Sequence, residues 1–63
     1  MVLLDIFTKN GVEKAQVEVD GTVFTVEEGE TFDDNFMLEN IHGSCADFLF
    51  GDQAFTLCVN PQK

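Results

Sequence analysis

Apolar and polar residues alternate along most of the chain, which is the period-two pattern of half-buried β-strands. In the first half the alternation is interrupted at Asn10-Gly11 and at Asp20-Gly21. These dipeptides strongly favour tight hairpin turns, because both central residues of a type I′ turn need positive φ. The first half therefore predicts a three-stranded meander. Its apolar face pairs Ile6 with Ala15, Leu4 with Val17 and Val2 with Val19, and then Val17 with Phe24 and Ala15 with Val26.

The second half predicts another three-stranded meander. A two-residue turn at Gly51-Asp52 brings Cys45 opposite Cys58, and a three-residue loop over 42–44 precedes the middle strand. A slip of one residue would move every side chain to the opposite face, so the apolar pattern fixes the register. The predicted inner face is rich in phenylalanine: Phe36, Leu38, Ala46, Phe48, Phe50, Phe55 and Leu57.

An acidic stretch over 27–35 joins the two halves. Gly29 permits a tight turn, and Asp33, Asp34 and Asn35 are common turn residues, so we expect a turn or a short helical turn there. Phe32 would anchor it. The predicted fold is all-β, a small sandwich or half-open barrel of two three-stranded antiparallel meanders. Residues 1–60 form one domain, and residues 61–63 form a tail.

The two cysteines lie opposite each other at a predicted non-hydrogen-bonded pair, where side chains approach most closely. A disulfide between Cys45 and Cys58 therefore fits without a change in the backbone. In the chain-entropy model it contributes about 3 kcal/mol, which matters for a chain of 63 residues with a thin core. A disulfide predicts maturation in an oxidising, extracytoplasmic compartment, with any targeting segment outside this chain.

Metal sites are the alternative for the same residues. His42, Cys45 and Cys58 offer three zinc ligands and Asp47 a weak fourth, but neither a CxxC motif nor a second histidine occurs. Two reduced, buried cysteines are a further alternative. The acidic stretch has calcium-type oxygen ligands without the EF-hand spacing. The prediction is a disulfide, with no metal and no cofactor.

Charge limits the partners. Three lysines and no arginine face twelve acidic residues, for a formal charge of −9. A nucleic-acid interface needs a basic face, so binding to nucleic acid is not expected, and an anionic lipid surface is disfavoured for the same reason. Catalysis by His42 would need a partner nucleophile or carboxylate in a cleft. We therefore expect a non-enzymatic domain whose partners are proteins, basic ones included.

Three apolar residues fall on the polar side of the first predicted meander: Leu3, Phe7 and Val23. Such a stripe beside an open sheet edge is a candidate partner-binding surface. Alternatively, Phe7 is covered by the tail or by Met37 and Ile41. Both alternatives remain open from the sequence.

The order of strands and turns in "KAQVEVDGTVFTVEEGETFDDNFMLENIHGSCADFLFGDQAFTL" resembles the β-domain family of PilP, from type IV pili, and the homology region of GspC, from type II secretion. The resemblance covers residues 14–57 and consists of apolar spacing and glycine turns. It implies an extracytoplasmic adaptor domain of a membrane-anchored protein that joins an inner-membrane platform to a secretin. The cysteine pair departs from the family pattern.

The expected function is therefore protein–protein interaction in an exported, membrane-anchored protein of a type IV pilus or type II secretion-like assembly. This segment itself is not expected to contact the membrane. The alternative is a small acidic inhibitor or nucleic-acid mimic, whose carboxylates imitate phosphates. Its binding to a nucleic-acid enzyme would weaken steeply with salt.

Overall fold

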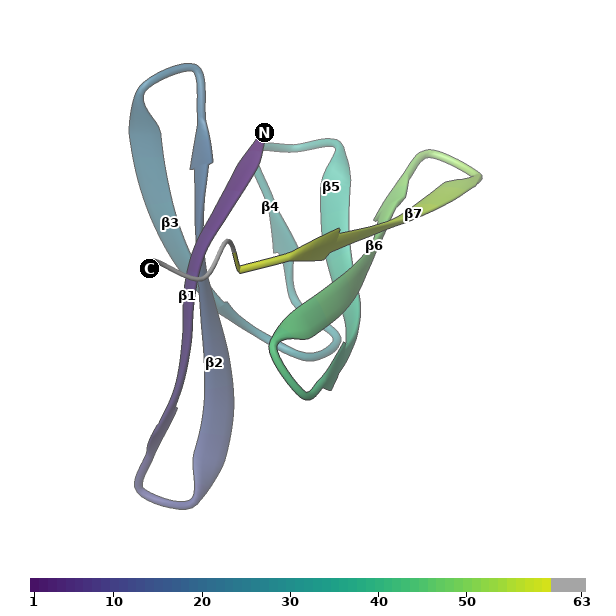
Figure 1. Cartoon of the computed structure of the whole chain (residues 1–63). Helices are drawn as coiled ribbons and strands as arrows, with labels where there is room; N and C mark the ends of the chain where they lie inside the picture. The colour runs from purple at the N-terminus through teal and green to yellow at the C-terminus, as the bar shows by residue number, and fades with distance from the viewer. Residues whose placement is uncertain (60–63) are drawn as a thin grey trace.

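Seven strands form two antiparallel sheets in the computed structural model, which describes residues 1–59 (Figure 1). The first sheet has the order β1-β2-β3 and consists of β1 (Val2–Lys9), β2 (Val12–Val19) and β3 (Thr22–Glu27). The second has the order β4-β5-β6-β7 and consists of β4 (Thr31–Phe32), β5 (Phe36–His42), β6 (Cys45–Phe50) and β7 (Gln53–Cys58). The sheets face each other without closing into a barrel, which confirms the predicted all-β fold of two antiparallel sheets; the second has four strands where three were predicted, because β4 adds to its border. The predicted tail, 61–63, lies outside the described residues.

The predicted turns set the register of the hairpins that they join. Asn10 and Asp20 have φ of 54° and 51°, each followed by a glycine with positive φ, as type I′ turns require. At Gly51-Asp52 only the glycine has positive φ, which matches a type II′ turn. The β2–β3 and β6–β7 hairpins therefore pair as predicted along their whole length.

The register of β1 differs from the prediction in its N-terminal part, before Asp5. A β-bulge at Leu4 puts Leu3 opposite Val17 and Val2 opposite Glu18, so the predicted pairs of Leu4 with Val17 and Val2 with Val19 are wrong. An extra residue on one strand turns the following side chains to the other face. As a result Leu3 is buried, with 4% of its surface exposed, whereas Leu4 is 40% exposed.

A second bulge lies at Glu39 in β5, and the loop between β5 and β6 is shorter than predicted. The turn has two residues, Gly43-Ser44, instead of the predicted three, and Ile41 therefore lies opposite Ala46. The bulge restores the predicted pairing of Leu38 with Phe48. Ile41 points inward and belongs to the buried core, so it is not available to cover the outer side of Phe7.

The acidic connector has the expected turn, which closes a hairpin and is not helical. Phe32 in β4 pairs with Phe36 in β5 across three residues, of which Asp33 and Asp34 have positive φ. Acidic side chains hold the turn before it: Glu30 Oε1 accepts the N–H of Glu27 at 2.9 Å, and Glu28 Oε2 accepts that of Ile41 at 2.7 Å. These carboxylates stabilise the connector by satisfying backbone donors.

The core lies between the two sheets and is built around phenylalanine. Phe32, 5% exposed, has its ring centroid 5.6 Å from that of Phe24 in the first sheet and 6.1 Å from that of Phe48 in the second. Phe48, Leu38 and Val17 are the largest fully buried side chains. Burial of such side chains is the main stabilising contribution in a domain of this size. No helix in residues 1–59 is long and apolar enough to cross a membrane.

Candidate functional site

The β6–β7 hairpin has the predicted disulfide at its open end. Cys45 and Cys58 are bonded, with their Cα atoms 3.9 Å apart. Val59 donates its N–H to the carbonyl of Ser44 at 2.8 Å, so the cysteine pair is flanked by a hydrogen-bonded pair and is itself of the non-hydrogen-bonded kind. The neighbouring Ala46 is buried, which puts the sulfurs on the outer face of the second sheet. Cys58 is exposed there.

A small polar network adjoins the disulfide on this outer face. Asp47 Oδ1 accepts the hydroxyl of Thr56 at 2.6 Å and lies 3.1 Å from Nε2 of His42. The hydrogen bond from Thr56, followed by that from His42, lowers the pKa of Asp47 below its ordinary value. The lowered pKa favours the ionised form of Asp47 beside β7. The network joins β5, β6 and β7 through side chains.

The zinc alternative fails at the sulfurs. The two Sγ atoms bind each other, and a disulfide leaves no thiolate to coordinate a metal. His42 is instead paired with Asp47. In residues 1–59 no group of His, Cys, Asp and Glu is placed to hold a metal ion.

Strand β7, which has no charged residue or proline, forms one border of the second sheet, and the two-residue β4 lies at the other. The pairing of β7 with β6 is regular from Gln53 to Cys58, without a bulge. The bond from Val59 to Ser44 shows that 53, 55, 57 and 59 direct their backbone groups toward β6. The N–H and C=O of Ala54 and Thr56 therefore face away from the sheet. The C-terminal end of β7 approaches β1, so the open part of this edge is near the Gly51-Asp52 turn (Figure 1).

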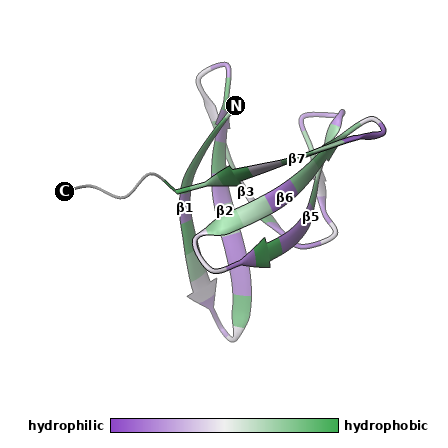
Figure 2. Ribbon diagram, turned by 45° about the vertical axis from the view of Figure 1, so that its right-hand side comes forward, coloured by the Kyte–Doolittle hydropathy of each residue, from purple (hydrophilic) through white to green (hydrophobic). Residues whose placement is uncertain are grey.

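Aromatic rings lie beside this open edge. Phe50, at the end of β6, is 46% exposed, and its ring centroid lies 4.8 Å from that of Phe36. Phe55 in β7 is half-buried, with its ring 5.7 Å from that of Phe48 and 6.4 Å from that of Phe36. The tip of the β6–β7 hairpin projects away from the first sheet (Figures 1 and 2). We call Phe36, Phe50 and Phe55 the tip cluster.

The predicted stripe on the first sheet is only partly present. Leu3 is buried in the core, so its predicted place on an exposed partner-binding surface is wrong; the bulge at Leu4 is the reason. Phe7 is half-buried and aligned with Lys14, whereas Val23 is 53% exposed and aligned with Glu18. Paired residues share a face, so both lie on the outer face, in separate rows. A role for Phe7 and Val23 in partner binding remains a prediction.

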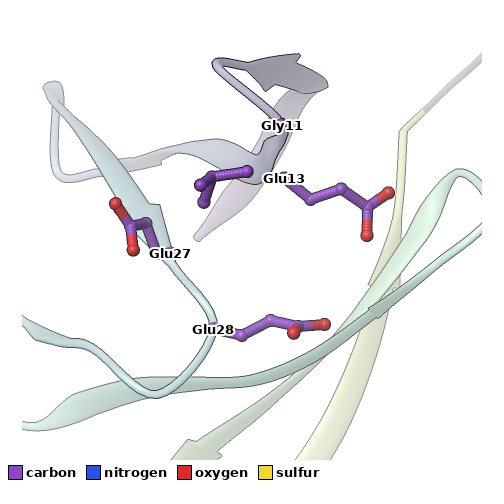
Figure 3. A pocket seen from close by; sticks show the side chains of 5 residues that line it. Gly11, Glu13, Glu27 and Glu28 are labelled. Carbon is purple, nitrogen blue, oxygen red and sulfur yellow. The ribbon is translucent and has the colours of Figure 1, made fainter.

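A shallow depression of about 410 Å³ lies where the β1–β2 turn meets the acidic connector (Figure 3). It is lined by Gly11, Val12, Glu13, Glu27 and Glu28. Two of its carboxylates already have partners: Glu27 binds Lys14 at 2.7 Å, and Glu28 binds the N–H of Ile41. The side chains of Glu27 and Glu28 point away from each other in Figure 3. Two of its three carboxylates are thus engaged, and no group of three or more His, Cys, Asp or Glu among the described residues is placed to hold a metal ion.

Sequence reasoning did not identify the open edge at Ala54 and Thr56. The signal was present, because β7 is a strand of six residues without charge in a chain of which 24% is charged. The predicted meander already places this strand at a border of its sheet, but a half-open barrel could have covered that border, and only the structure shows that the sheets stay apart there. Comparisons of the chain with protein-family models, curated proteins and solved structures find no match.

Proposed function

We propose that the chain is a non-enzymatic protein-interaction domain that acts as an adaptor. The observation that carries this proposal is the uncharged open edge of β7 beside the half-exposed tip cluster. A free edge offers unpaired backbone donors and acceptors to another chain, and natural proteins usually protect such edges with charges, proline or bulges. An unprotected edge of this kind fits a site that a partner covers.

The cellular setting in this proposal is an exported, membrane-anchored protein of a type IV pilus or type II secretion-like assembly. The disulfide between Cys45 and Cys58 is consistent with an oxidising, extracytoplasmic location. The order of turns in residues 14–57, which resembles the PilP and GspC homology-region domains, supports the assembly. An adaptor needs a stable folded surface, and the disulfide helps a domain of this size to provide one.

Site-specific photo-crosslinking in cells tests the adaptor role. A photoreactive residue is placed at position 54 on β7, at position 23 on the outer face of the first sheet, and at position 13 in the depression. The proposal predicts crosslinks to pilus or secretion assembly proteins from position 54 or 23, with position 13 as the matched control. Crosslinks to no assembly protein from either surface would contradict it.

The alternative, an acidic inhibitor or nucleic-acid mimic, rests on the formal charge of −9. The described acidic residues are distributed over both sheets and several turns, Asp20, Asp33 and Asp52 among the latter. A phosphate mimic needs its charges gathered on one surface that faces the enzyme. Binding to a nucleic-acid enzyme, weakened by salt, would favour this alternative over the adaptor.

A further inference from the structure

We propose that β7 binds an extended, basic segment of a partner protein by strand addition, next to the tip cluster. This inference rests on the proposed function and names its binding mode and the chemistry of its partner. The geometry of the edge is the first support. Ala54 and Thr56 each direct an N–H and a C=O away from β6, so a strand laid alongside would form a regular ladder.

The side chains on the two faces of β7 give the added strand something to pack against. On the inner face, Phe55 is half-buried and lies within the tip cluster, so an apolar residue opposite it would cover the remaining ring surface. On the outer face, Ala54 is exposed and small, and it offers no obstacle. Backbone bonds would supply affinity, and the ring cluster would select an apolar residue.

Charge identifies the occupant as basic. The second sheet and its turns contain no lysine or arginine, and their acidic residues include Asp52 in the turn before β7 and Asp47 beside Thr56. A second copy of the chain would bring the same acidic residues to the interface and be repelled. Lysine or arginine at the ends of the added strand would meet these carboxylates instead.

Substitution with proline at position 54 separates strand addition from folding. The N–H of Ala54 makes no ladder bond with β6, and proline is tolerated on an edge strand where the N–H faces solvent. Ala54→Pro should therefore keep the fold while removing a donor and placing a ring against the incoming strand. Ala54→Ser, which keeps the donor, is the matched control.

The probe is a labelled peptide of about eight residues with alternating valine and threonine and lysine at both ends, compared with the same peptide with glutamate at both ends. Binding to the whole chain is followed by fluorescence anisotropy and by amide shifts in NMR spectra. The lysine peptide should bind and shift the amides of Ala54 and Thr56.

Ala54→Pro should weaken binding about tenfold or more, and Ala54→Ser should not. Asp52→Asn should weaken it about two- to fivefold at low salt.

Four outcomes would overturn the inference. These are equal binding to Ala54→Pro and the native chain, amide shifts confined to the first sheet, no binding of the lysine peptide at millimolar concentration, and self-association that Ala54→Pro abolishes. The adaptor role would still hold after any of these outcomes if crosslinks from position 23 reach an assembly protein. Failure of the adaptor role would instead show as the absence of crosslinks from both positions.

Discussion

Strand β1, at a border of the first sheet, and strand β7, at a border of the second, differ in how their outward backbone groups are protected. Strand β1 has a bulge at Leu4, and the carboxylate of Asp5 accepts the N–H of Ile6 at 2.9 Å, so a backbone donor is already satisfied. Its residues include the charged Asp5 and Lys9. Bulges and charges are the usual devices that prevent edge-to-edge pairing. Strand β7 has neither, and it is held to β6 by a disulfide.

On β7, the bond that holds the strand in place is separate from any feature that would protect its edge from pairing with another strand. A bulge and a charge on β7 would guard its edge but would also disturb its pairing with β6 and the position of Phe55. The disulfide between Cys45 and Cys58 secures the strand without occupying the outward backbone groups of Ala54 and Thr56. The edge of β1 is thus protected, whereas that of β7 is ordered and open.

The largest effect on stability is expected from Phe48→Ala in β6, and Phe50→Ala in the same strand is its comparison. Phe48 is fully buried, and its replacement should lower the free energy of unfolding by about 3–5 kcal/mol. Phe50 is 46% exposed, so Phe50→Ala should cost much less, about 1 kcal/mol, while weakening binding of the lysine peptide. Urea unfolding and anisotropy measure the two effects. Similar losses of stability in both variants would contradict the open tip cluster.

The bulge in β1 can be tested at two neighbouring leucines. Leu3→Ala should cost about 2–5 kcal/mol because Leu3 is buried against Val17. Leu4→Ala should change stability by about 0.5 kcal/mol or less because Leu4 points outward. Thermal or urea unfolding of the pair measures the difference. A larger loss of stability in Leu4→Ala than in Leu3→Ala would contradict the bulge and favour the regular register, with Leu4 inside.

Much of this fold follows from the sequence, and the bulges mark where the sequence is insufficient. Glycine turns fixed the β2–β3 and β6–β7 registers, down to Cys45 opposite Cys58. The bulges have no glycine or proline to mark them. Their trace is a spacing of three between inward residues, Leu3 to Ile6 and Leu38 to Ile41, where a regular strand gives two or four. Such a spacing has several explanations until the opposite strand is placed.

The candidate site was predicted in part for a related reason. The disulfide depends on local pairing in one hairpin, so turn chemistry was enough to find it. The open edge depends on whether the first sheet closes over the border strand of the second, and that is settled by packing between distant segments. The turn at Asp33 and Asp34 was expected, but the hairpin that it closes was not, because β4 has only two residues and shows no alternating pattern.

Removal of the disulfide tests whether β7 depends on its covalent bond. In the double variant Cys45→Ala, Cys58→Ala the free energy of unfolding should fall by about 2–3 kcal/mol. The amides of Phe55 and Leu57, which face β6, should exchange faster, whereas Val17 in β2 should change only with global stability. Native hydrogen exchange separates these effects. Uniform acceleration across both sheets would show that β7 is not locally dependent on the bond.

The smallest effect concerns the carboxylate beside β7. Thr56→Val removes the hydroxyl that donates to Asp47 and should raise the pKa of Asp47 toward its ordinary value. Because the folded state lowers this pKa, ionised Asp47 stabilises the native chain above the unfolded pKa. That contribution disappears as the pH falls through the folded pKa, and Thr56→Val should reduce it at neutral pH.

A carboxyl ¹³C titration of Asp47 measures the shift. Thr25→Val on β3 is the matched control, because Thr25 is also an exposed strand threonine and makes no contact with Asp47. An unchanged pKa in Thr56→Val would show that the Thr56 hydroxyl does not lower the pKa of Asp47.

Residue-by-residue amide exchange, with and without the lysine peptide, tests the open edge of β7 most directly. In the free chain the amides of Ala54 and Thr56 should exchange quickly while those of Phe55 and Leu57 are protected. Saturation with the peptide should protect Ala54 and Thr56 and leave β1 unchanged. Protection of Ala54 and Thr56 in the free chain, or protection gained only along β1 or β3, would contradict the account.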